Sequence, residues 1–428
     1  MFKKIFGAVV ALGILALAIF LLIAWESSIN PISPPGPDAF SKEQIKRGEV
    51  LAGLGNCETC HTTDPAKPLA GGRAMPTPFG TLYSTNITPD PDKGIGQWSE
   101  EAFSRAMREG VSRSGSHLFP AFPYTHFTKL SDDDISDLYA YVMSRQAIAA
   151  EPPENTLEFP YNIRLLLAGW KLLFFDEGRF EPDADKGDVW NRGAYIAEGA
   201  GHCSACHTPR NALGAEDSGK AWEGAIINNW YAPALNANNR TPAGWTEKEA
   251  YEYLRHGGSP FHGVAVGSMS DVVHDGLKYA PDSDLRALAV WLSDLAQAPG
   301  EQQAHDSSAT AIRTAQQLQN PSTMMGEGER LFAHACAACH YNEPNNPNTL
   351  RPDMALNSAI SAPTPVNLIR VTLNGVSLKE GIPEAMMPGF GQALSDRQIA
   401  SLLAYLRSTH TDLPAWTDLE QQVRNQRP

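Results

Sequence analysis

An apolar run occupies the N-terminus of the chain. From Ile5 to Trp25 almost every residue is apolar, two lysines precede the run, and Glu26 is the first charge beyond it. About 20 apolar residues are enough for a helix to cross a bilayer. The lysines favour an N-terminus held in the cytoplasm, which would place the rest of the chain in the periplasm. We therefore expect one N-terminal transmembrane helix in the inner membrane. A cleaved signal peptide is the alternative, but Leu22 stands where a cleavage site needs a small residue.

Three later segments share a helical spacing of apolar residues. In each, apolar residues fall at i, i+3, i+4 and i+7, which places them on one face of a helix. The three sets are Ile135, Leu138, Tyr139 and Val142; Leu285, Leu288, Ala289 and Leu292; and Ile399, Leu402, Leu403 and Leu406. An aromatic residue recurs at one register of these sets, as Tyr141, Trp291 and Tyr405. One such face indicates only a buried helix, but its repetition predicts three copies of one all-α unit.

Hydroxyl residues mark the starts of several predicted helices. Ser131 with Asp134, and Ser395 with Gln398, have the spacing of a capping box. Ser99 and Thr246 each follow a tryptophan and precede an acidic first turn, so we expect both to be N-caps.

The repeat divides the chain into seven parts. They are a membrane anchor with a Pro-rich spacer at 1–37, module one at 38–150, a connector at 151–187, module two at 188–298, a linker at 299–325, module three at 326–410 and a tail at 411–428. The apolar run at 162–175 of the connector carries Arg164 and Lys171, and it is too short and too polar for a second span. We expect a helix there that is buried between modules or docks on a partner. The tail is expected either to cross another module or to lie disordered.

Composition indicates a globular, acidic protein. Charged residues make up 19% of the chain and hydrophobic ones 42%, and the net charge is −14. This acidity argues against nucleic acid or anionic lipid as the main partner.

All six cysteines lie in three Cys-x-x-Cys-His motifs. The motifs are Cys57, Cys60 and His61; Cys203, Cys206 and His207; and Cys336, Cys339 and His340. This pattern is typical of covalent c-type haem attachment, in which two thiols three residues apart bond to the vinyl groups of one porphyrin edge and the next histidine binds the iron. A thioredoxin-like motif needs no following histidine, a structural zinc site needs four ligands, and disulfides leave the histidines unexplained. The sequence therefore predicts three haem c groups.

The sixth iron ligand would set each reduction potential. A distal methionine raises the potential, which suits onward electron transfer. Met387, within a Met-Pro pair before the last predicted helix, is the expected ligand of module three, with Met386 as its rival. Met269 is the expected ligand of module two.

Module one lacks a methionine at the corresponding position, where Phe122 cannot bind iron. Met107, on the helix predicted to start near Ser99, is the first choice and His126 the second. Met75 and His117 are further candidates. Ligation by two histidines would lower the potential of this haem relative to the other two.

The organisation resembles the class I cytochrome c fold, a small all-helical domain around one haem whose first and last helices cross. Beyond the anchor, the chain resembles the three-haem cytochrome c subunits of membrane-bound bacterial dehydrogenases. The resemblance is carried by Thr-Asn-Ile-Thr-Pro-Asp at 85–90, Asn-Ile-Arg-Leu-Leu-Leu-Ala-Gly-Trp at 162–170, and the run around the second motif at 201–214.

That resemblance implies an electron-transfer subunit rather than an enzyme. The substrate would be oxidised in a separate dehydrogenase subunit carrying molybdenum, quinone or flavin chemistry, with a small iron–sulfur subunit as a further partner. Electrons would pass to ubiquinone or a terminal oxidase. The run at 120–127, with Phe122, is more similar to the cytochromes that accompany molybdenum hydroxylases acting on aldehydes or N-heterocycles. The alternative function is a catalytic multihaem cytochrome, a peroxidase or thiosulfate-oxidising enzyme, that uses the haem of module one.

Overall fold

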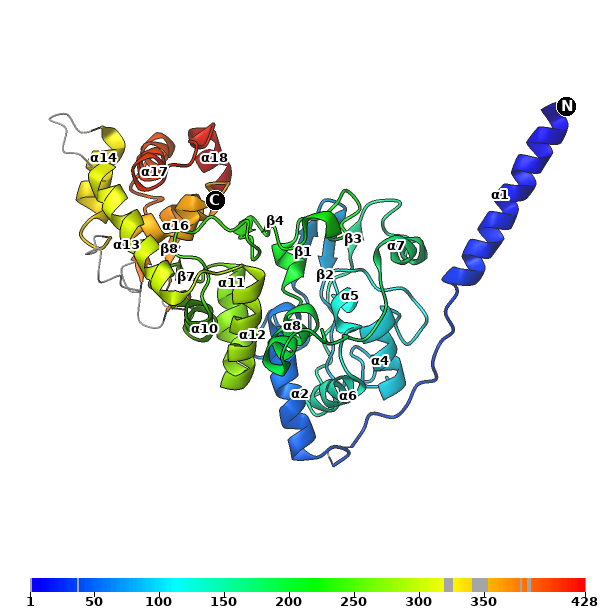
Figure 1. Cartoon of the computed structure of the whole chain (residues 1–428). Helices are drawn as coiled ribbons and strands as arrows, with labels where there is room; N and C mark the ends of the chain where they lie inside the picture. The colour runs from blue at the N-terminus through cyan, green and yellow to red at the C-terminus, as the bar shows by residue number, and fades with distance from the viewer. Residues whose placement is uncertain are drawn as a thin grey trace. The chain divides into compact units, whose positions relative to one another are not determined.

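The computed structural model divides into two compact units (Figure 1). It describes residues 2–36, 38–318, 326–340, 353–377, 379–382 and 386–427. The first unit comprises residues 1–181 with 198–202, and the second comprises 182–197 with 203–428.

The first unit is mainly helical with one small sheet. Its helices are α1 (Phe2–Ala24), α2 (Lys42–Leu54), α3 (Cys57–His61), α4 (Glu100–Glu109), α5 (Tyr124–Phe127), α6 (Asp132–Met143) and α7 (Leu166–Phe174). The strands β1 (Ala74–Thr77), β2 (Gly80–Tyr83) and β3 (Thr156–Leu157) form an antiparallel sheet in that order.

The second unit repeats this pattern over a longer stretch. Its helices are α8 (Asp188–Glu198), α9 (Ser204–His207), α10 (Glu247–His256), α11 (Ser268–Asp271), α12 (Asp282–Leu295), α13 (Glu301–Leu318), α14 (Glu327–Leu331), α15 (Ser358–Ser361), α16 (Val366–Asn374), α17 (Asp396–His410) and α18 (Leu419–Gln426). Short helical turns occupy Ser218–Lys220, Val272–Gly276, Leu277–Tyr279, Phe332–Cys336 and Met354–Leu356. Three antiparallel pairs complete the unit, namely β4 (Ala225–Ile227) with β5 (Trp230–Ala232), β6 (Gly258–Ser259) with β7 (Gly263–Val264), and β8 (Gly375–Val376) with β9 (Met387–Pro388).

The three helices predicted from apolar spacing all form, as α6, α12 and α17, and each buries its predicted face. Their starts are also as predicted where hydroxyl caps were expected. The Ser131 hydroxyl accepts from the Asp134 amide, and Ser395 with Gln398 makes the complete capping box. Ser99 and Thr246 cap α4 and α10. These local signals therefore fix the helix boundaries on which the packing depends.

A glycine on an early helix permits each of these three helices to pass very close to it. A Cβ at the glycine would lie 2.0–2.2 Å from a carbonyl oxygen of the facing helix, and 2.7–2.8 Å from the Cβ of its aromatic residue. The contacts are Gly48 with Asp137 and Tyr141, Gly193 with Ala287 and Trp291, and Gly328 with Ser401 and Tyr405. The pairs are α2 with α6, α8 with α12, and α14 with α17. The recurring aromatic register therefore marks the same crossing three times.

Two segments expected to be linker and tail are folded onto their unit. The predicted linker at 299–325 contains α13, whose Ile312 and Ala315 pack in a buried cluster with Phe261 and Leu356. The tail forms α18, and its Val423 is fully buried against α16 and α17. The buried face of α13 includes small residues such as alanine and serine, so it does not stand out as an apolar face in the sequence. Composition alone therefore indicated a linker.

The stretch after α1 lies on the first unit. The amide of Ile29 donates to the Arg113 carbonyl at 2.8 Å, and that of Ile32 to the Gln97 carbonyl at 3.0 Å. The Arg105 guanidinium also donates to the Ser27 carbonyl at 2.7 Å. The first part of the predicted spacer is therefore held by hydrogen bonds to the segment around α4.

Candidate haem attachment sites

The first two Cys-x-x-Cys-His motifs each form a short helical turn. Cys57 to His61 make up α3, and α9 begins directly after Cys203 and ends at His207. The six cysteines all lie among the described residues, and none of them is in a disulfide. Burial raises the pKa of the Cys57 and Cys203 thiols to about 12 and that of Cys336 to about 11. These thiols lack the lowered pKa of a redox-active Cys-x-x-Cys.

Both histidines are oriented by a backbone carbonyl. The Nδ1–H of His61 donates to the Thr85 carbonyl at 2.7 Å, and that of His207 donates to the Pro233 carbonyl at 2.7 Å. Burial also lowers the pKa of both imidazoles, which favours the neutral form. With the proton on Nδ1, Nε2 carries the lone pair that a metal needs, and this second hydrogen bond is the usual support of a metal-binding histidine.

The loops that follow the two histidines have the same construction. The hydroxyl of Thr62 accepts from the Leu69 amide, and that of Thr208 from the Trp222 amide, both at 3.0 Å. Leu69 and Trp222 both adopt left-handed backbone, with φ of 62° and 65°. A two-stranded hairpin then returns the chain to the carbonyl that each histidine contacts, β1–β2 in the first unit and β4–β5 in the second.

Sequence reasoning missed the residues that build these loops. The signal was present, because both motifs continue as Cys-x-x-Cys-His-Thr. The run at 85–90 was noticed only as a resemblance, and the structure gives it a role. The Asn86 carboxamide donates to the carbonyls of Ile148 and Ala150, at 2.7 and 3.0 Å, next to the Thr85 carbonyl that accepts from His61.

The third motif lies at the edge of a described range. Cys336 ends a helical turn after α14, and the His340 amide donates to the Cys336 carbonyl at 3.0 Å. Residues 341–352, which follow the motif, lie outside the described residues.

The predicted methionine ligands of modules two and three occupy short elements. Met269 is the second residue of α11, which begins directly after Gly267, whose φ is 56°. Met387 is in β9 and pairs with Val376 of β8. The side chain of its rival Met386 is 67% exposed, whereas Met387 is half-buried. The described neighbourhood therefore favours Met387 over Met386 for a ligand that faces inward.

Module one offers a different set of contacts. Met107 is buried within α4, and Met75 is half-buried in β1. The ring of His117 uses both nitrogens, since Nδ1 accepts from Lys171 and Nε2–H donates to the Ala24 carbonyl, each at 3.0 Å. His117 would have to give up one of these bonds to bind iron. In His126, Nδ1 lies 3.0 Å from the Glu198 carbonyl. Phe122 packs edge-on against Phe127.

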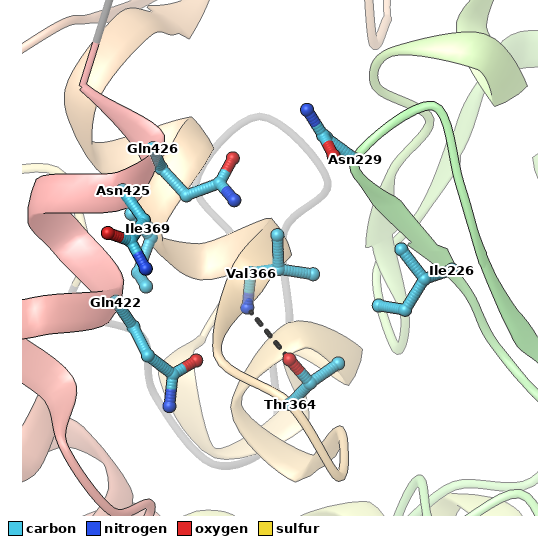
Figure 2. Close-up of a pocket in the computed structure, with 8 residues that line it drawn as sticks. All are labelled: Ile226, Asn229, Thr364, Val366, Ile369, Gln422, Asn425 and Gln426. Carbon is cyan, nitrogen blue, oxygen red and sulfur yellow. Dashed lines mark hydrogen bonds between the residues drawn. The ribbon is translucent and has the colours of Figure 1, made fainter. Parts of the chain in front are cut away.

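A small pocket in the second unit is lined by no residue of the three motifs (Figure 2). It measures about 200 Å³ and is lined by Ile226, Asn229, Thr364, Val366, Ile369, Gln422, Asn425 and Gln426. None of these side chains titrates, so the pocket has no acid–base chemistry. In the described part of the chain, no three His, Cys, Asp or Glu side chains gather around a common metal position.

The donor set fits covalent haem c. In the first two motifs the thiols lie one turn apart, and the following histidine presents Nε2 because its Nδ1 is engaged. Together with the crossed helices, these sites define a c-type cytochrome.

Comparison with known proteins agrees. The Cytochrome c family model matches residues 45–146 and 325–410. The chain is 37% identical to the gluconate 2-dehydrogenase cytochrome c subunit of Pantoea cypripedii, over 85% of each chain. It is 34% identical to the fructose dehydrogenase cytochrome subunit of Gluconobacter japonicus, over 96% of this chain and 88% of that one. The protein therefore belongs to the cytochrome c subunits of membrane-bound dehydrogenases, which transfer electrons and do not oxidise the substrate themselves.

A further relative is much longer than this chain. A nicotinate dehydrogenase subunit of Pseudomonas putida is 46% identical over 98% of this chain, but the match spans only 34% of the relative. The chain thus spans about a third of that protein's length.

Proposed function

We propose that this chain carries three haem c groups in three tandem class I domains and passes electrons from a periplasmic dehydrogenase subunit to ubiquinone or a terminal oxidase. When bound, each haem would supply one-electron Fe(III)/Fe(II) cycling. Cys57 and Cys60, Cys203 and Cys206, and Cys336 and Cys339 would form the thioethers. His61, His207 and His340 would be the proximal ligands, with Met107, Met269 and Met387 opposite them.

The threefold glycine crossing carries this proposal. The glycine of each crossing lies a similar number of residues before one Cys-x-x-Cys-His motif. The second helix of each crossing, α6, α12 or α17, buries the same predicted face. The repeat supports one haem per crossing, including module two, which lies outside the two segments that the family model matches.

Helix α1 is the proposed membrane anchor. Among the described residues it is the one helix long and apolar enough to cross a bilayer, and nearly all of it is exposed. The lysines at its start support an N-terminus in the cytoplasm and haem domains in the periplasm.

A molybdenum hydroxylase is the partner that we favour. Nicotinate is an N-heterocyclic acid, and the relative named for its dehydrogenation shares 46% of its matched residues with this chain. This agrees with the similarity inferred from the run at 120–127. The alternative is a quinoprotein or flavoprotein partner, which the names of the alcohol, gluconate and fructose dehydrogenase relatives allow. With a molybdenum hydroxylase, a small iron–sulfur subunit would be a further partner.

The haem count tests the proposal directly. We expect a pyridine haemochrome assay of the full-length protein to give three haems per chain. Replacing both cysteines of one motif with alanine should remove one third of the haem, and the three such variants should behave alike. A count of two, or one motif whose loss leaves the haem content unchanged, would refute the three-domain assignment.

The partner requires a separate measurement. Purification of the native complex in mild detergent should retain a large subunit that contains molybdenum. Recovery of a flavin or a quinone cofactor in its place would overturn the partner class while leaving the haem assignment intact.

A further inference from the structure

Helix α7 turns its leucines outward. Leu165, Leu166, Leu172 and Leu173 lie at the spacing of one helix face around Gly169, and all four leucines are exposed. Leu172 and Leu173 are 66% and 71% exposed. Just before the helix, Phe159 is 79% exposed. Elsewhere in the described residues, outside α1 and the stretch after it, exposed large apolar residues occur singly along the sequence, as Val189 does. A contiguous patch of this kind marks an interaction surface.

The charged residues of the same segment point into the protein. The Lys171 ammonium donates to the carbonyls of Glu109 and Gly110 at the end of α4, and to Nδ1 of His117. The Arg164 guanidinium donates to the His117 carbonyl at 3.0 Å. Cations near the last carbonyls of a helix are favourable. The segment is therefore amphipathic in the sense opposite to that of a soluble surface helix, which buries its leucines and exposes its lysines.

The apolar face continues directly onto α1. The two helices are in contact, and a Cβ at Gly169 would lie 3.5 Å from the ring of Phe20. Phe20 precedes Ala24, the last residue of α1, by four residues, which is about 6 Å along a helix. His117 joins both elements, because it contacts Lys171 of α7 through Nδ1 and the Ala24 carbonyl through Nε2. The outward face of α7 thus lies at the level of the last turn of α1.

We infer that α7 and the residues before it from Phe159 lie in the outer boundary of the bilayer, with their leucines against lipid acyl chains. The inference rests on the proposed membrane anchor, since the depth of α7 is measured from α1. A helix of this kind lies in the plane of the interface with its apolar face about 5–10 Å deep. Trp25 and Tyr161, both exposed, have the aromatic character that is enriched at such interfaces.

Photolabelling by lipid tests the inference. The full-length, haem-loaded protein is placed in nanodiscs of phosphatidylcholine that carries a diazirine on the acyl chain, irradiated, digested and mapped by mass spectrometry. We expect lipid adducts on residues 2–24 and on 159–174, and none on the peptide that contains Val189. Val189 serves as the control because it is an exposed apolar residue that belongs to neither α1 nor the segment at 159–174.

Two matched variants sharpen the test. In the double variant L172D/L173D, adducts on residues 159–170 should fall to the level of the Val189 peptide, while adducts on 2–24 and the haem content stay unchanged. The control variant V189D should label as the unaltered protein does. Adducts confined to 2–24 in the unaltered protein would overturn the inference and leave the anchor standing, which is the result expected if a protein partner covers α7. An absence of adducts on 2–24 would instead refute the anchor itself.

Discussion

Replacing Gly193 with alanine tests how tightly the helices of module two cross. The added Cβ would lie 2.1 Å from the Ala287 carbonyl oxygen, whereas ordinary contact begins at 3.4 Å. The obstacle is backbone, so α8 and α12 must separate by about 1 Å. Overpacking of this kind costs about 1–3 kcal/mol. Alanine in a helix recovers up to about 1 kcal/mol relative to glycine. We expect a net loss of about 2 kcal/mol, because a backbone obstacle places the cost at the upper end of that range.

Hydrogen exchange measured by mass spectrometry resolves this loss by module. A change of about 2 kcal/mol should raise the opening equilibrium of α8 and α12 about 30-fold and leave α2 and α6 unchanged. Gly187 provides the control, since a Cβ there would meet no atom within 4 Å. The G187A variant should stay within about 0.5 kcal/mol of the unaltered protein. Equal protection of α8 in G193A and G187A would refute the reasoning about the crossing.

Three further predictions concern single residues. Replacing Thr208 with valine should cost about 1 kcal/mol of local stability in the loop to Trp222, because the amide of Trp222 loses its acceptor, whereas serine should keep the hydrogen bond. Hydrogen exchange over 208–224 measures both variants, and equal protection of the two would contradict the role of the hydroxyl. Met269→His should lower the reduction potential of one haem and leave the others unchanged in a spectroelectrochemical titration, and three unaltered potentials would remove Met269 as a ligand. Burial lowers the pKa of His410 from 6.5 to about 4, so unfolding takes up a proton between these values. The His410 contribution to stability should be complete above about pH 6.5 and fall as the pH drops toward about 4, and H410Q should flatten this slope in denaturation midpoints; an unchanged slope would show that other groups cause it.

Local patterns in the sequence predicted the elements that carry the sites. The apolar spacing found α6, α12 and α17, and the hydroxyl caps found the starts of α6 and α17, because each signal depends on residues within one or two turns. The Cys-x-x-Cys-His motifs are equally local. The glycines of the crossings mark a contact between segments distant in the sequence, which sequence spacing alone does not show.

Longer-range contacts could not be predicted in the same way. The carbonyls that orient His61 and His207 lie 24 and 26 residues further along the chain, at the ends of hairpins. Their identity is invisible in the side-chain sequence, since any residue supplies a carbonyl. The sequence did not decide whether the tail crosses another module or lies disordered. Among the described residues of the tail, Val423 is the single buried one in a polar segment, and the partners of Val423 lie on α16 and α17.

The hydrogen bonds that follow α1 bear on how the protein meets its electron donor. Ser27, Ile29 and Ile32 are each bonded to the segment around α4. In the proposed membrane arrangement, the segment between α1 and the first unit is therefore short and held in place, and it does not act as a flexible tether. The height of the first unit above the lipid surface is fixed by the fold, and a redox partner has to offer its own docking face at that height.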